Sequence, residues 1–112
     1  MRKAVLDAVR RHLKTTAVFK VAHFTVSGSH AFLRAGEVVP DGDNLQETDL
    51  FVETLLERRS DGRWRVLHLW NLMDEGEKAP HDAFLERVRR VMREHALPQT
   101  MLPEDLRPTA GA

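Results

Sequence analysis

Cysteine and tyrosine are both absent from this sequence, and its charges cancel. Without cysteine the chain can form no disulfide, thiolate nucleophile or cysteine-ligated zinc site. The 112 residues carry 17 basic and 17 acidic side chains, so no global field favours nucleic acid or anionic lipid. The composition, 42% apolar and 30% charged, is typical of one globular domain.

Long apolar runs are absent as well. No stretch approaches the roughly 18 residues that are needed to span a bilayer. The first residues, MRKAVLDAVRRHL, carry charges at both ends and in the middle, which argues against a signal peptide there. From this chain alone we expect a cytoplasmic protein, and an exported one if a leader was removed.

The segment Leu50–Trp70 predicts a β-hairpin around which the rest of the chain must be arranged. Asp61 and Gly62 lie between two runs rich in β-branched, aromatic and aliphatic residues, which is a strong hairpin signal. If Ser60 pairs with Arg63, the register sets Leu56 opposite Leu67, Thr54 opposite Leu69 and Val52 opposite Asn71.

Both faces of this hairpin are largely apolar, so both need cover. One face is expected to carry Phe51, Leu55, Trp64, Val66, His68 and Trp70. The first helix can cover one face, and the other needs the second helix or a partner subunit, because large exposed apolar patches mark interfaces. We therefore predict a homodimer, with an interface made by Trp64, Val66, Trp70 and Phe51.

Helices and strands are expected on either side of the hairpin. An apolar stripe predicts a helix from about Arg2 to Lys14. Strands are predicted at 17–26 and 30–39, joined by a three-residue loop that sets Phe24 opposite Phe32 and His23 opposite Leu33.

Proline marks the expected ends of several segments. Pro40 is expected to end the second strand, and residues 40–49 to form a polar loop. An acidic turn at 73–77 precedes a second helix, predicted to begin near Pro80 and to end at Pro98. We expect one domain over 1–97 and a proline-rich tail over 98–112.

The predicted element order is an N-terminal helix, a four-stranded antiparallel meander sheet and a C-terminal helix, which defines an α+β domain. This order resembles the cystatin-like and NTF2-like folds, in which the sheet curls around a helix. NTF2-like domains carry more helix before the sheet than this chain does.

A more local resemblance covers residues 2–70. The segments FKVAHFTVSGSHAFLRAG and FVETLLERRSDGRWRVLHLW resemble a group of small, uncharacterised bacterial proteins. In that group a G-x-W-A-F segment is followed by A-L-L-R-R-x-x-G-x-W-R-V, and His30 stands where the pattern has tryptophan. The resemblance implies a shared fold and, for many members, export, but no function.

Six histidines raise the hypothesis of a metal site, because imidazole is a common metal ligand. His23, His30 and His68 lie on predicted strands, but no pair has HxH or HxxxH spacing. Glu53, Glu57 or Asp49 could complete a site only if the strand order brought them near. The acidic loop from Asp41 also fails the EF-hand pattern. We expect no metal and no cofactor.

A histidine–carboxylate pair is the enzyme hypothesis, with His68 and Glu53 as the catalytic candidates and Asp49 as a further carboxylate. Burial among aromatic residues would shift their pKa values toward acid–base chemistry. NTF2-like isomerases and dehydratases often hold an oxyanion with tyrosine, which this chain lacks. The segment Ser27–Ser29 does not fit a nucleophile elbow either.

Three functions remain open. The first, which we expect, is a homodimeric protein-interaction or binding module without catalysis. The second is a small-molecule binder or lyase- or isomerase-like enzyme with an internal pocket. The third is a weak nucleic-acid binder that uses the arginines around the central hairpin, Arg58, Arg59, Arg63 and Arg65, beside Trp64.

Overall fold

The computed structural model describes residues 2–71 and 78–107. An N-terminal helix, an antiparallel sheet and a C-terminal helix follow one another, which confirms the predicted α+β class. The elements are α1 (Arg2–Leu13), β1 (Val18–Ser27), β2 (His30–Asp41), β3 (Asn44–Arg58), β4 (Trp64–Asn71) and α2 (Lys78–Glu94), followed by the short 3₁₀ helices η1 (Gln99–Met101) and η2 (Glu104–Leu106). Within the described ranges no helix is long and apolar enough to cross a membrane.

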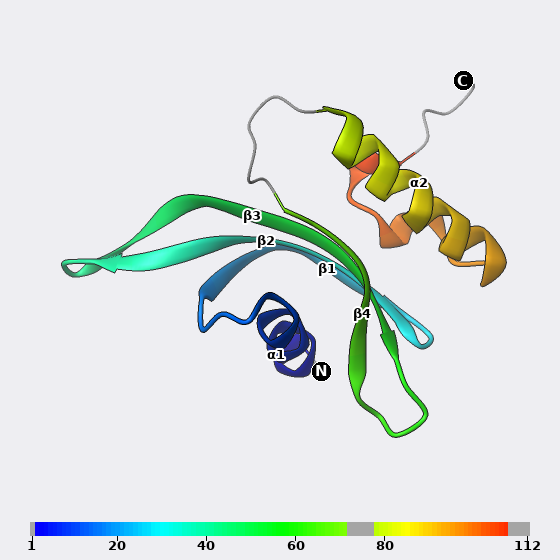
Figure 1. Ribbon diagram of the computed structural model, residues 1–112, viewed down its shortest axis with the longest axis horizontal. Coiled ribbons are helices and arrows are strands. Elements are labelled where there is room, and N and C mark those ends of the chain that lie inside the picture. The colour runs from blue at the N-terminus through cyan, green and yellow to red at the C-terminus, as the bar shows by residue number, and fades with distance from the viewer. Residues whose placement is uncertain (1, 72–77, 108–112) are drawn as a thin grey trace.

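The four strands form a meander in the order β1-β2-β3-β4, and the sheet is curved. Helix α1 lies under the concave side, while α2 packs against the opposite side (Figure 1). Each side has its own apolar cluster. The α1 cluster contains Val5, Val9, Leu33, Val52, Leu56 and Trp64. The α2 cluster contains Phe32, Leu55, Phe84, Val88, Met92 and, from the C-terminal segment, Met101, Leu102 and Leu106.

Strand β3 contributes to both clusters because successive side chains of a strand point to opposite faces. Val52 and Leu56 pack toward α1, whereas Leu55 packs toward α2, and all three are fully buried. Thr54, on the α1 side, donates from Oγ1 to the backbone oxygen of His68 at 2.9 Å, which satisfies its buried hydroxyl. The predicted need to cover both faces of the hairpin is met within one chain.

The β1–β2 hairpin differs from the predicted register by one residue. Ser27 pairs with His30, so the loop has two residues rather than three. Phe24 consequently lies opposite Leu33, and His23 lies opposite Arg34. Gly28 has a φ of 58°, which suits a two-residue turn with glycine at its first central position.

A β-bulge in β4 changes the predicted β3–β4 pairing. Thr54 pairs with Leu69 as predicted, but Leu56 pairs with Val66 because Leu67 is the extra residue of the bulge. Trp64 and Val66 therefore pack with the α1 cluster, and Trp70 packs with the α2 cluster. The prediction that these three side chains share one face is wrong.

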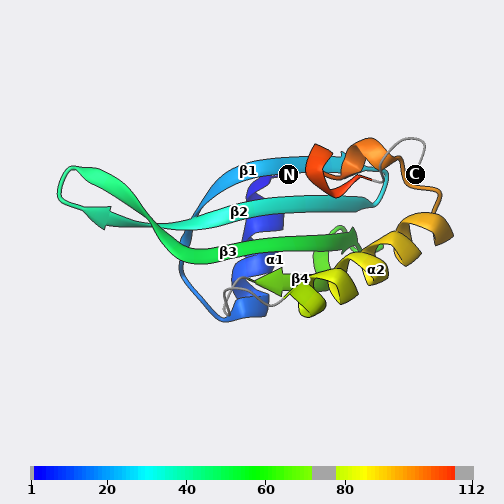
Figure 2. The same ribbon diagram turned by 90° about the horizontal axis from the view of Figure 1, so that it is seen from above.

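The prediction that Pro40 ends its strand is also wrong. Strand β2 continues through Pro40 to Asp41, and β3 begins at Asn44, so most of residues 40–49 are paired strand rather than loop. Proline is tolerated here because β1 pairs with β2 only as far as Val38, which leaves this end of β2 as an edge. The resulting two-stranded β2–β3 ribbon projects beyond the sheet (Figure 2). We call residues 38–47 the arm.

Both helices end with a residue in the left-handed region. Lys14 has a φ of 56° and Ala96 a φ of 52°. At the end of α2, the amide of Leu97 donates to the oxygen of Met92 and the amide of Ala96 to that of Arg93, the pattern of a Schellman cap. Helix α2 thus ends at Glu94, before Pro98, by capping. The predicted acidic turn at 73–77 lies outside the described residues.

Ala96→Gly should raise the free energy of unfolding by about 0.5–1 kcal/mol, because glycine adopts a positive φ without the steric penalty of a Cβ. The matched change Ala83→Gly, at an exposed position inside α2, should lower it by about 1 kcal/mol. Urea denaturation measures both. A loss of stability in both variants would contradict the left-handed cap.

Candidate functional site

Glu53 is a buried carboxylate at the interface between the sheet and α2. Its exposed fraction is 2%. Arg34, on the neighbouring β2, donates from Nε to Oε2 at 2.8 Å. His81, in the first turn of α2, places Nε2 2.5 Å from Oε1. Both carboxylate oxygens therefore have a polar partner. Arg34 links Glu53 to the neighbouring strand, and His81 links it to α2.

Arg34 extends this network to the C-terminal segment. Its two terminal nitrogens donate to the two carboxylate oxygens of Asp105 at 2.9 and 2.8 Å, a bidentate pair. These hydrogen bonds hold the pKa of Asp105 below its ordinary value. The indole of Trp70 lies against the His81 ring, with centroids 4.3 Å apart. The network fixes α2 and the segment after it on one side of the sheet.

The predicted acid–base pair of His68 and Glu53 does not form. Glu53 pairs with His81 and Arg34 instead, and His68 lies opposite Leu55 in the ladder. Burial, followed by the nearby charge of Arg87, lowers the pKa of His68. The side chain of Asp49, the further carboxylate of this hypothesis, lies outside the described part of the structure.

His81 was missed by the sequence reasoning, although a signal for it exists. His81, Phe84, Leu85 and Val88 follow the i, i+3, i+4, i+7 spacing of a buried helical stripe. A histidine at the start of such a stripe is turned toward the sheet and needs a polar partner there. Glu53 provides that partner.

A second polar cluster joins the ends of three elements. His30 begins β2, Glu57 lies opposite it near the end of β3, and His95 follows the last residue of α2. The Nε2 atom of His30 is 3.6 Å from Oε2 of Glu57. The rings of His30 and His95 have centroids 4.6 Å apart. Burial, and then the neighbouring His95, lowers the pKa of His30, while Glu57 opposes the shift.

The expectation of no metal was based on the absence of short-range metal-binding motifs, and this cluster forms no such motif. Its members stand at 30, 57 and 95. Antiparallel pairing brings His30 and Glu57 together, and the packing of α2 adds His95. The strand order therefore brings together three potential metal ligands that are too far apart in the sequence to form a recognisable motif.

A basic groove runs between α1 and the β3–β4 hairpin. Its lining includes the cationic residues Arg11, Arg59, Arg63 and Arg65 together with His12, Ala8, Trp64 and Val66. Trp64 is only 7% exposed, and the guanidinium of Arg58 lies 5.9 Å from its ring centre. The indole therefore offers no open face for stacking a nucleic-acid base, which the nucleic-acid hypothesis requires.

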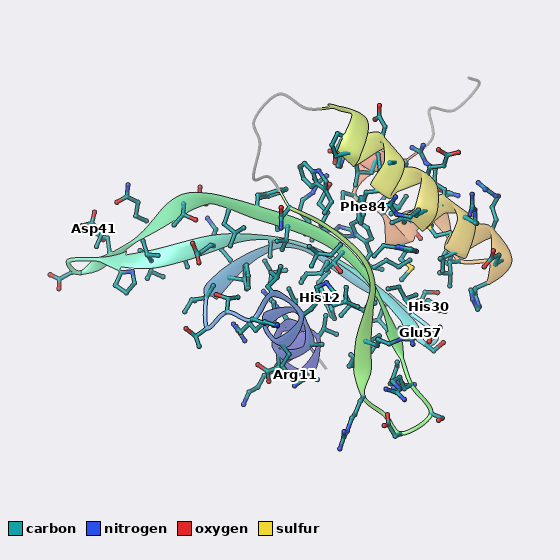
Figure 3. All side chains as sticks on the ribbon, in the orientation of Figure 1. Arg11, His12, His30, Asp41, Glu57 and Phe84 are labelled. Carbon is teal, nitrogen blue, oxygen red and sulfur yellow. The ribbon has the colours of Figure 1, made fainter. Side chains whose placement is uncertain are left out.

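The arm and the adjacent start of β1 expose large apolar side chains. Val18 is 54% exposed, Val39 39% and Leu45 65%. Val18 and Leu45 line a groove at the base of the arm. Asp41 and Asp43 lie at the arm's tip and are exposed. Figure 3 shows Asp41 at the far end of the arm, remote from Arg11 and His12 on α1.

The four residues predicted to form an interface do not make one surface. Trp64 is buried beside α1, Val66 packs against the same cluster, and Trp70 packs against the α2 cluster. Phe51 is partly buried, and the guanidinium of Arg34 lies 5.9 Å from its ring centre. Among the described residues, the exposed large apolar side chains lie on the arm and at the start of β1 instead.

No protein-family model, curated protein or solved structure matches this chain. The resemblances to cystatin-like and NTF2-like folds and to the small bacterial group therefore stay predictions.

Glu53→Gln should lower the free energy of unfolding by about 3 kcal/mol, because it leaves Arg34 without its buried anion. Asp105→Asn removes a second anion from the same arginine, but Asp105 is 65% exposed, so a loss below about 1 kcal/mol is expected. Chemical denaturation of both variants at neutral pH provides the comparison. Equal losses would show that the buried Glu53–Arg34 pair stabilises the fold no more than the exposed Asp105–Arg34 pair.

Proposed function

We propose that this protein is a homodimeric interaction module in which the arm of each copy occupies the basic groove of the other. The observation that carries the proposal is the projecting arm, which is apolar at its base and acidic at its tip. The arm and the groove are complementary in charge and are remote from each other within one chain.

The arm has little to stabilise it within one chain. Beyond Val38, β2 is paired only with β3, so the arm is a two-stranded ribbon. Isolated ribbons of two strands are marginally stable in water. Here the ribbon also holds Leu45 and Val39 in solvent. Packing against another molecule would bury this apolar area and stabilise the paired conformation.

Charge identifies the surface that the arm tip would meet. Among the described residues, Asp41 and Asp43 take part in no ion pair, and neither do Arg11, Arg59 and Arg63 in the groove. Bringing these groups together across an interface would replace unpaired surface charges with opposite pairs. Such complementarity favours association and fixes its register.

A two-fold arrangement satisfies both surfaces at once. The arm projects from one end of the molecule, and the β3–β4 hairpin that borders the groove lies toward the other end (Figure 1). In an antiparallel pair of copies, each arm can therefore lie along its partner's groove. Isologous contacts of this kind close the assembly as a dimer and leave no unpaired surface of the same type.

Charge reversal tests the arrangement. Asp41→Lys with Asp43→Lys should give a monomer in sedimentation velocity, because a cationic tip would meet a cationic groove. Arg59→Glu with Arg63→Glu should also give a monomer. An equimolar mixture of the two variants should dimerise, because each arm then meets a groove of opposite charge. Raising the salt concentration should weaken the wild-type dimer.

A matched control changes the same charge elsewhere. Asp82→Lys with Glu86→Lys, at exposed positions on α2, should leave the dimer intact. Circular dichroism should show that every variant is folded. A monomeric wild type, or a mixture that stays monomeric, would overturn the proposal.

A further inference from the structure

We infer that His30, Glu57 and His95 form a binding site for a divalent transition-metal ion of the zinc type. Their ligand atoms all lie within 4.8 Å of one another. They come from β2, β3 and the residue after α2, so an ion bound there would connect the C-terminal end of α2 to the sheet. This inference does not rest on the proposed dimer.

The decisive observation is the state of His30. The residue is 3% exposed, and its Nε2 atom is buried without a hydrogen-bond partner among the described residues. An unpartnered buried nitrogen is unfavourable, and native structures avoid it. The other ring nitrogen, Nδ1, lies 3.5 Å from Oγ of Ser29. With the proton on Nδ1, beside that hydroxyl, Nε2 is the unprotonated nitrogen and lies 3.6 Å from Oε2 of Glu57, which is the tautomer of a histidine that binds a metal through Nε2.

The spacing of the other two ligands suits an ion. Ligand atoms about 2.1 Å from a tetrahedral ion lie about 3.4 Å from one another. The 3.6 Å between Nε2 of His30 and Oε2 of Glu57 is close to that value and too long for a hydrogen bond. His95 is exposed, so its ring can turn toward the pair without disturbing the core. Figure 3 shows His30 and Glu57 beneath the C-terminal end of α2.

The donor set selects the class of ion. Two imidazoles and one carboxylate suit zinc and its neighbours among the late transition metals, whereas magnesium and calcium prefer oxygen ligands. Three protein ligands leave a coordination position for water, as in zinc sites that are open to a further ligand.

The test uses the full chain without an affinity tag. Isothermal titration with ZnCl₂ should show one ion per chain, and saturating zinc should raise the melting temperature. His95→Ala and Glu57→Gln should each weaken zinc binding by at least about 100-fold, beyond the loss typical of a supporting residue. Both side chains are partly or fully exposed, so both variants should fold.

His12→Ala, which removes an exposed histidine from α1, is the matched control and should leave zinc affinity unchanged. Cobalt should compete with zinc and give the visible absorption of a low-coordinate site, whereas magnesium should not compete. Zinc binding that survives both His95→Ala and Glu57→Gln, or no binding at micromolar zinc, would overturn the inference.

Discussion

The central constraint on this structure is that β3 is apolar on both faces. Val52 and Leu56 point to one side of the sheet and Leu55 to the other, and all three are fully buried. A sheet with one solvent-exposed face would leave the apolar side chains on one side of this strand in water. The chain meets the constraint by placing α1 on one side and α2 with the C-terminal segment on the other. The three-layer arrangement follows from this strand.

Covering both faces also determines where polar groups gather. The interface between the sheet and α2 holds a buried carboxylate, Glu53, which is acceptable because Arg34 forms an ion pair with it and His81 lies within hydrogen-bond distance of it. At the end of α2, by contrast, the buried Nε2 of His30 has no hydrogen-bond partner in the described part of the chain and lies beside Glu57. One polar cluster is therefore internally satisfied and the other is not. That difference is why the second cluster, rather than the first, indicates a ligand.

The class of fold could be predicted from sequence because it depends on short-range patterns. Turn residues and apolar spacing located both helices and the β1–β2 and β3–β4 hairpins, but they missed the paired arm between β2 and β3 and the bulge at Leu67. That extra residue separates Trp64 from Trp70, so the predicted interface was divided between two faces. The pairing of Glu53 with His81 was hidden for another reason: it depends on how α2 docks, which no local pattern specifies.

The most direct test of the two-sided core uses the same substitution on both helices. Val9 on α1 and Val88 on α2 are each fully buried. Val9→Ala and Val88→Ala should each lower the free energy of unfolding by about 2 kcal/mol, in a single cooperative transition in urea. If Val88→Ala left the stability unchanged while Val9→Ala lowered it, α2 would not cover the sheet, and the core would be one-sided.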